Sequence, residues 1–150
     1  MLDRIIILAL IVVAATLGWA ALRAWRAAKL RRLGGEAPFA GVVPGGRPAV
    51  VAFSTPTCAE CRTRQAPALD RLAAAMGESV AVAHLSALDH PDLVERIGIL
   101  TVPATVVLDA QGAVRQVNLG FADEWRLAEQ VRGLGKQYNR EGPRKGAALS

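Results

Sequence analysis

The chain contains two cysteines, Cys58 and Cys61, which stand three residues apart between an apolar run and a helical pattern. On the first turn of a helix, residues i and i+3 have Cα atoms about 5–6 Å apart, which is the separation that a disulfide needs. The unpaired N–H groups at a helix N-terminus also favour a thiolate. Such a pair can attack a disulfide and then resolve the mixed disulfide, so the spacing predicts dithiol–disulfide exchange.

A purely structural disulfide is the alternative interpretation of this pair. The ring that residues i and i+3 close is small, so a disulfide between them constrains the unfolded chain very little. The 150 residues are also enough for one domain that buries its own core. We therefore expect the pair to be redox-active.

The N-terminal region is strongly apolar. Ile5–Leu22 is a stretch of 18 residues without a charge, close to the roughly 20 residues of a bilayer-spanning helix. It is longer than a signal-peptide core, which has about 7–15 residues. Gly18 and Ala20 form a small-x-small pair, which leaves signal cleavage as the alternative. We predict a transmembrane anchor over residues 5–22, preceded by a stub of residues 1–4.

Basic residues follow the anchor, whereas only Arg4 precedes it. The positive-inside rule then predicts a single-pass membrane protein with its later part on the cytoplasmic face. Basic side chains also contact anionic headgroups, so we expect residues 5–32 to bind membrane lipid. The net charge of +5 is explained in this way, and no nucleic-acid-binding motif accompanies it. The cations are Arg23, Arg26, Lys29, Arg31 and Arg32.

Glycines and prolines divide the rest of the chain. Gly34-Gly35 begins a loop region rich in these residues, with a short strand predicted near Phe39–Val43. We therefore expect a basic juxtamembrane linker over residues 23–37 and one domain over residues 38–135. Residues 136–150 are polar and basic, and this composition predicts a disordered tail.

Apolar runs and helical periodicity alternate within the domain. Short continuous apolar runs predict buried strands, and i, i+3, i+4 spacing predicts helices. Thr57 is the predicted N-cap of the first of these helices, Pro67 should kink it, and Trp125 should pack in the last. The expected strands are Pro48–Phe53, Val80–Leu85, Ala104–Leu108 and Val114–Leu119. The expected helices run from Thr57 to about Met76, from Pro91 to just before Gly98, and from about Ala122 to Leu134.

This order of elements, with a Cys-x-x-Cys pair on the first helix of the domain, resembles the thioredoxin fold over about Pro38–Leu134. Val102-Pro103 stands where thioredoxin-like proteins carry a cis-proline. Pro103–Gly112 is most similar to the membrane-tethered thiol–disulfide oxidoreductases of the TlpA/ResA group. The resemblance implies an α/β protein with a mixed central sheet flanked by helices, behind the transmembrane helix.

The resemblance also implies the chemistry and the partners. Cys58 would attack the substrate disulfide, and the more buried Cys61 would resolve the mixed disulfide. Val102, beside Pro103, would offer its backbone to an extended substrate chain. Thr57 replaces the tryptophan usual in thioredoxins, which suggests an altered substrate preference. The partners would be protein thiols or disulfides, with electrons from a reductase or a membrane donor, and neither cofactor nor metal is expected.

The residues around the pair depart from the thioredoxin pattern. Glu60, between the cysteines, should oppose thiolate formation at Cys58, whereas Arg62 and Arg64 should favour it. The sequence leaves the net effect open. Pro67 lies one position later than the corresponding proline of most relatives, which leaves the helix register open as well.

The family's buried proton acceptor is also replaced. The positions of an aspartate and a lysine that thioredoxins pair behind the resolving cysteine are Ala52 and His84 here. An imidazole exchanges protons near neutral pH, so we hypothesise that His84 is the general base for Cys61. The alternative is a half-buried histidine with a backbone partner.

Two other functions remain open from sequence. Cys58, Cys61, His84 and His90 would make a complete tetrahedral set for zinc or copper. A thioredoxin-like adaptor that binds peptides would not use its cysteines at all. Our preferred interpretation is a membrane-tethered oxidoreductase that acts as a reductant. The TlpA/ResA group acts outside the cytoplasm, so an extracytoplasmic domain is the alternative to the cytoplasmic one.

Overall fold

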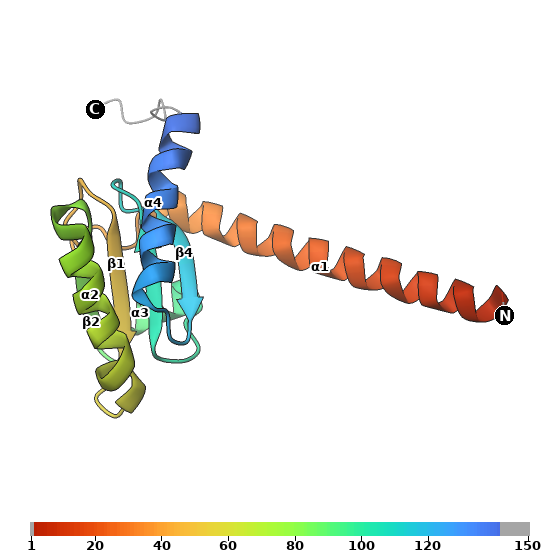
Figure 1. Ribbon diagram of the computed structural model, residues 1–150, viewed down its shortest axis with the longest axis horizontal. Helices are drawn as coiled ribbons and strands as arrows, with labels where there is room; N and C mark the ends of the chain where they lie inside the picture. The colour runs from red at the N-terminus through yellow and green to blue at the C-terminus, as the bar shows by residue number, and fades with distance from the viewer. Residues whose placement is uncertain (1, 142–150) are drawn as a thin grey trace. The chain divides into compact units, whose positions relative to one another are not determined.

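The computed structural model describes residues 2–141 of the chain. The chain divides into two compact units, Met1–Arg32 and Leu33–Ser150. From Leu2 onward, the first unit is part of a single long helix. The second unit contains a sheet with helices packed against it (Figure 1), and its residues include the cysteine pair.

The N-terminal helix α1 (Leu2–Glu36) is rich in alanine and leucine, two of the strongest helix formers. Its segment Ile6–Lys29 has a mean hydropathy of 2.2 and is long and apolar enough to cross a bilayer. The helix continues through Gly34-Gly35, so the loop predicted there is wrong. Each glycine costs a helix only about 1 kcal/mol relative to alanine, which a long helix tolerates.

One mixed sheet is built from four strands: β1 (Ala49–Ser54), β2 (Ala81–Ser86), β3 (Ala104–Leu108) and β4 (Val114–Leu119). Their order is β2-β1-β3-β4. β1 pairs in parallel with β2 and antiparallel with β3, and β3 pairs antiparallel with β4. The central strands β1 and β3 are almost wholly buried because helices cover both faces. The predicted mixed sheet is confirmed.

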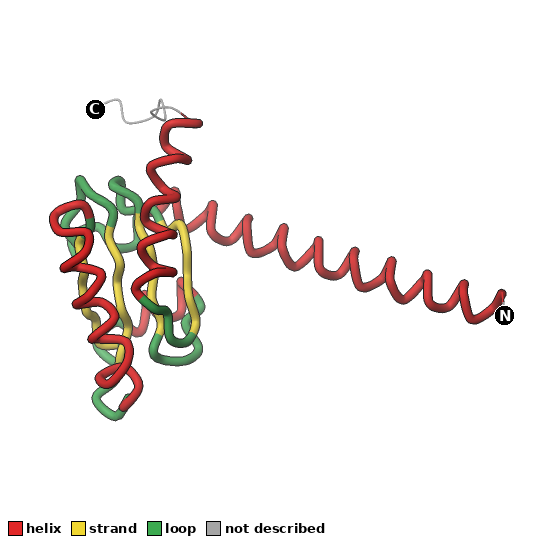
Figure 2. Tube along the Cα trace, viewed as in Figure 1, coloured by secondary structure: helices red, strands yellow, loops and turns green. Residues whose placement is uncertain are grey.

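Helices lie on both sides of this sheet, as Figures 1 and 2 show. α2 (Ala66–Met76) and α4 (Glu124–Glu141) cover one face, and α3 (Pro91–Ile97) covers the other. The 3-10 turn η2 (Gly77–Ser79) leads from α2 towards β2. Gly98, just past α3, has a positive φ of 82°, which glycine adopts without strain and which ends the helix.

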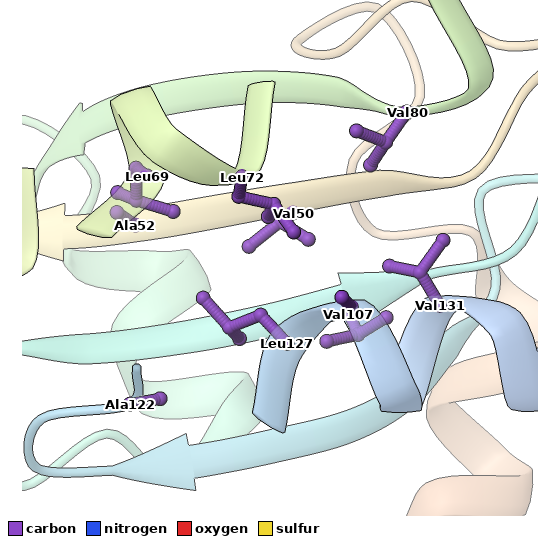
Figure 3. Packing of buried hydrophobic residues seen from close by; sticks show 10 residues of the cluster. Val50, Ala52, Leu69, Leu72, Val80, Val107, Ala122, Leu127 and Val131 are labelled. Atoms are coloured by element: carbon purple, nitrogen blue, oxygen red, sulfur yellow. The ribbon is translucent and has the colours of Figure 1, made fainter. Parts of the chain in front are cut away.

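The main core lies between the sheet and the pair α2 and α4. Side chains on alternate positions of β1 and β3 meet apolar side chains from both helices (Figure 3). The periodicity that predicted these helices therefore marks the faces that they bury. The fully buried members include Val50, Leu69, Leu72, Val107 and Leu127.

Three local predictions are wrong. Phe39–Val43 forms hydrogen-bonded turns rather than a strand, because Phe39 is a single buried anchor that packs on Phe53 with ring centroids 6.2 Å apart. The last helix continues past Leu134 to Glu141, so part of the predicted disordered tail is helical, and residues 142–150 lie outside the described residues. Trp125, expected to pack, is 75% exposed.

A π-helical turn, η1 (Cys61–Gln65), precedes α2. The Ala66 N–H donates to the carbonyl of Cys61, five residues earlier. Such a turn holds one more residue than an α-helical turn. The sequence showed one extra residue before Pro67, and η1 accommodates it, so Pro67 falls within the first turn of α2.

Candidate active site

Cys58 and Cys61 form a disulfide whose Cα atoms are 5.3 Å apart. A short loop, Thr55–Thr57, joins the end of β1 to the pair, and the Cys58 N–H donates to the carbonyl of Thr55 at 3.1 Å. Helical residues follow from Ala59. The structure therefore places the pair on the first turn of the helix, as the spacing predicted.

Cys58 is itself the cap of this helix. Its Sγ accepts a hydrogen bond from the backbone N–H of Cys61 at 3.1 Å, which is the contact that an N-cap side chain makes with the third helical residue. The prediction that Thr57 is the N-cap is therefore wrong. A sulfur in this position receives an N–H that would otherwise lack a partner, and this contact stabilises its thiolate.

The two sulfurs differ in exposure. Cys58 is half-buried, whereas Cys61 is only 6% exposed. A disulfide substrate therefore reaches Cys58 before Cys61. This asymmetry suits an attacking thiolate followed by a protected resolving thiol.

The charged side chains near the pair are already partnered. Arg64 Nη1 lies 2.8 Å from Glu60 Oε1, and its guanidinium lies 4.2 Å from the centroid of the Phe121 ring. Arg62 donates to the carbonyl of Pro56. Glu60 was predicted to oppose thiolate formation at Cys58, but its charge is offset by that of the neighbouring Arg64.

The predicted substrate loop lies at the same end of the sheet. The Val102–Pro103 peptide bond is cis, as predicted. Ala104, the next residue, pairs with Phe53 near the end of β1. The antiparallel pairing of β1 and β3 therefore places the cis-proline and the cysteine pair at the same end of these two strands. Thr57 is exposed and Val102 is half-buried.

His84 shares a cavity with Cys61. In the β1–β2 register His84 is opposite Ala52, so both side chains point to the face that α2 covers. A cavity of about 460 Å³ opens there, and its lining includes Ala52, Cys61, His84 and Asp89. The small side chain of Ala52 leaves space where the family's aspartate would lie.

The second histidine does not join the pair. His90 precedes α3, and its carbonyl accepts the N–H of Val94 at 3.1 Å. Among the described residues, no group of three or more His, Cys, Asp or Glu side chains is placed to hold a metal ion.

Sequence reasoning missed one buried polar residue, Gln65. Its side chain is packed at the end of η1 and is hydrogen-bonded to Ala122, 57 residues away. No local signal marks it, because a glutamine on a helix normally faces solvent. The π turn η1, which begins at Cys61 and ends at Gln65, was likewise not predicted from the sequence.

Comparison with known proteins agrees with this geometry. The Thioredoxin family model matches residues 36–132. The thioredoxin of Rhodospirillum rubrum is 31% identical over 90 residues, which are 60% of this chain and 85% of that protein. The thioredoxin of Alicyclobacillus acidocaldarius subsp. acidocaldarius is 28% identical over 96 residues, which are 64% of this chain and 90% of that protein.

Solved structures show the same fold. Thioredoxin from Trypanosoma brucei brucei superposes with a TM-score of 0.54 at 20% identity and covers 65% of this chain and 83% of its own. Chloroplastic thioredoxin z gives 0.54 at 22% identity and covers 61% and 80%. With its Cys58–Cys61 disulfide, this chain belongs to the thioredoxin family as a thioredoxin-like thiol–disulfide oxidoreductase.

Proposed function

We propose that this protein is a membrane-tethered reductant of protein disulfides and that Cys58 is its attacking thiolate. The observation that carries the proposal is the N–H of Cys61 directed at the half-buried Sγ of Cys58. It supplies thiolate stabilisation at the one cysteine of the pair that a substrate can reach.

The reaction has two exchange steps. The Cys58 thiolate attacks one sulfur of a substrate disulfide, forms a mixed disulfide and displaces the other sulfur as a thiolate. Cys61 then loses its proton and attacks Cys58 Sγ. This step releases the second substrate thiolate and closes the Cys58–Cys61 disulfide. Two electrons pass from the protein to the substrate, and the disulfide state described here is the product.

We propose His84 as the base that accepts the proton of Cys61. The support is the shared cavity, which connects the buried thiol with an exposed imidazole. Since Ala52 has no side-chain acceptor, the histidine replaces a carboxylate at this step. Because the imidazole is exposed, it can pass this proton on to solvent.

We propose that an extended substrate chain lies along Val102 and Pro103, beside Thr57. The register of β1 and β3 supports this placement, because it puts the cis-proline and Cys58 at one edge of the sheet. Backbone hydrogen bonds to Val102 would hold substrates of differing sequence.

For the anchor we propose residues 5–22, with the basic residues up to 32 at the anionic headgroups. The charge bias favours a domain on the cytoplasmic face, recharged by a reductase or a membrane electron donor. An impermeant maleimide added to intact, pre-reduced cells tests on which side of the membrane the domain lies. Protection of Cys58 supports the cytoplasmic face, and labelling places the domain outside.

The direction of electron flow is tested by the reduction potential of the pair. The full chain in detergent is equilibrated with dithiothreitol or glutathione buffers, and the fraction of the Cys58–Cys61 disulfide is measured. A potential near about −270 mV supports a reductant, and one near about −120 mV shows an oxidant. Failure to form a reversible disulfide would instead favour the adaptor or metal-binding alternative.

A further inference from the structure

Gln65 is a buried polar side chain with an unusual partner. It is 2% exposed, and buried polar groups are retained only when their hydrogen bonds are made. Its Nε2 donates to the carbonyl of Ala122 at 3.0 Å, and its Oε1 accepts the N–H of Ala122 at 3.0 Å. One side-chain amide thus binds both backbone groups of a single residue, much as a neighbouring strand would.

This contact joins two parts of the active site. Gln65 is the last residue of η1, the turn that Cys61 begins, and it lines the same cavity as Cys61. On the other side, Ala122 follows Gly120, whose N–H donates to the carbonyl of Pro103 at 2.9 Å. The backbone of residues 120–122 therefore connects these hydrogen bonds and links the turn of the resolving cysteine to the cis-proline loop.

Phe121, which lies between Gly120 and Ala122 in the chain, also contacts η1. Phe121 lies under the guanidinium of Arg64, which belongs to η1. That contact is exposed, and water competes with it. Gln65 is 2% exposed, so water competes far less with the hydrogen bonds of its amide. Gln65 is therefore the stronger of the two attachments between η1 and residues 120–122.

We propose that Gln65 is a positioning residue that fixes the cis-proline loop relative to Cys58 and thereby determines the rate with polypeptide disulfides. This inference rests on the proposed docking of substrate at Val102. A polypeptide must contact Val102 and Cys58 together, so it depends on their spacing. A small disulfide needs the two cysteines but no contact at Val102, so we expect its rate to be independent of the position of the cis-proline loop.

The test compares two substrates in single turnovers of the full chain in detergent. The chain is first reduced with dithiothreitol and then separated from it, so that the Cys58–Cys61 dithiol supplies the two electrons. One substrate is a disulfide-linked peptide dimer, and the other is bis(2-hydroxyethyl) disulfide. For Gln65→Leu we expect kcat/KM to fall about tenfold with the peptide, mainly through KM, and to change less than about twofold with the small disulfide.

The matched control is Gln130→Leu. Gln130 in α4 exchanges two amide hydrogen bonds with Asn118 in β4, each of 2.9 Å, and neither residue lines the cavity. This variant loses the same kind of interaction away from the cysteines. We expect its ratio of peptide rate to small-disulfide rate to equal that of the wild type.

A second variant, Gln65→Glu, keeps the inference testable if Gln65→Leu does not fold. A protonated carboxyl can both donate to and accept from Ala122, whereas a carboxylate can only accept. The ratio of the two rates should therefore be near wild type at about pH 5 and reduced at about pH 8, since burial keeps such a carboxyl protonated longer. Arg62, His84 and Asp89 face the same cavity, so the ratio of the two rates is compared with that of the wild type at each pH.

The outcomes separate the two proposals. If the wild type reduces neither substrate, the proposed function fails. If the wild type reduces both, a Gln65→Leu variant that loses both rates equally or keeps both overturns the positioning role. A ratio for Gln65→Glu that does not depend on pH overturns it too. A selective loss with the peptide, absent in Gln130→Leu, supports it.

Discussion

The two ends of the sheet are held in different ways. At the end where β3 turns into β4, Asp109 accepts hydrogen bonds from the N–H groups of Gln111 and Ala113 and from Arg115, all within six residues. At the redox end, Gln65 binds Ala122 across 57 residues. At the first end the buried side chain binds its own turn, and a backbone bond from the Gly46 N–H to the Ala110 carbonyl adds a distant segment. At the second end the buried side chain itself joins two segments that are distant in sequence. The chemistry lies where distant segments meet, so its geometry depends on the whole fold.

The largest effect should come from His84→Gln at the redox end. If His84 takes the proton of Cys61, resolution of the mixed disulfide should slow by about a hundredfold, while attack by Cys58 is nearly unchanged. Rapid-mixing kinetics with a disulfide-linked peptide measures both steps. His90→Gln is the matched control, because it makes the same substitution outside the cavity lining. Unchanged resolution over about pH 6–8 would contradict the role of His84.

Asp109→Ala should destabilise the end of the sheet where β3 turns into β4 and leave the redox end intact. Asp109 is buried, and its loss leaves two backbone N–H groups and Arg115 without this acceptor. We expect the free energy of unfolding to fall by about 2–3 kcal/mol, with disulfide-reduction activity per folded molecule unchanged. Chemical denaturation together with an activity assay measures both. A specific loss of activity would show that the two ends are coupled.

The smallest effect concerns an exposed pair at the redox end, Arg71 and Glu124, whose atoms approach to 2.8 Å. The hydrogen bond from Arg71 lowers the pKa of the Glu124 carboxyl below its ordinary value. The pair therefore stabilises the fold above the unfolded-state pKa of Glu124, and this contribution is lost as the pH falls through the lower folded-state pKa.

Arg71→Met should accordingly lower the melting temperature slightly at neutral pH and by less at about pH 3, since protonation of the Glu124 carboxyl increases as the pH falls. Added salt should reduce the difference at neutral pH, because the pair is exposed. Thermal unfolding at both pH values measures it. An equal loss at both would mean that the packing of the Arg71 stem, and not its charge, stabilises the fold.

The same contrast explains what the sequence could predict. The four strands, the Asp109–Gly112 turn and the cysteine-bearing helix follow from local apolar runs and turn residues, and the structure confirms them. Gln65 has no such signal, because its partner is remote. Thr57 was the expected cap by residue preference, but the sulfur of Cys58 makes the contact. Trp125 was expected to pack, yet it lies on the exposed side of α4, away from the buried residues Leu127, Ala128 and Val131.

The central claim is that Cys58 attacks and Cys61 resolves. The most direct measurement is to mix the reduced full chain, carrying either Cys61→Ser or Cys58→Ser, with a disulfide-linked peptide and to follow the adducts by mass spectrometry. We predict a stable mixed disulfide on Cys58 in Cys61→Ser and little adduct in Cys58→Ser, because Cys61 is buried. Equal adducts in both variants, or an adduct on Cys61 alone, would contradict the account.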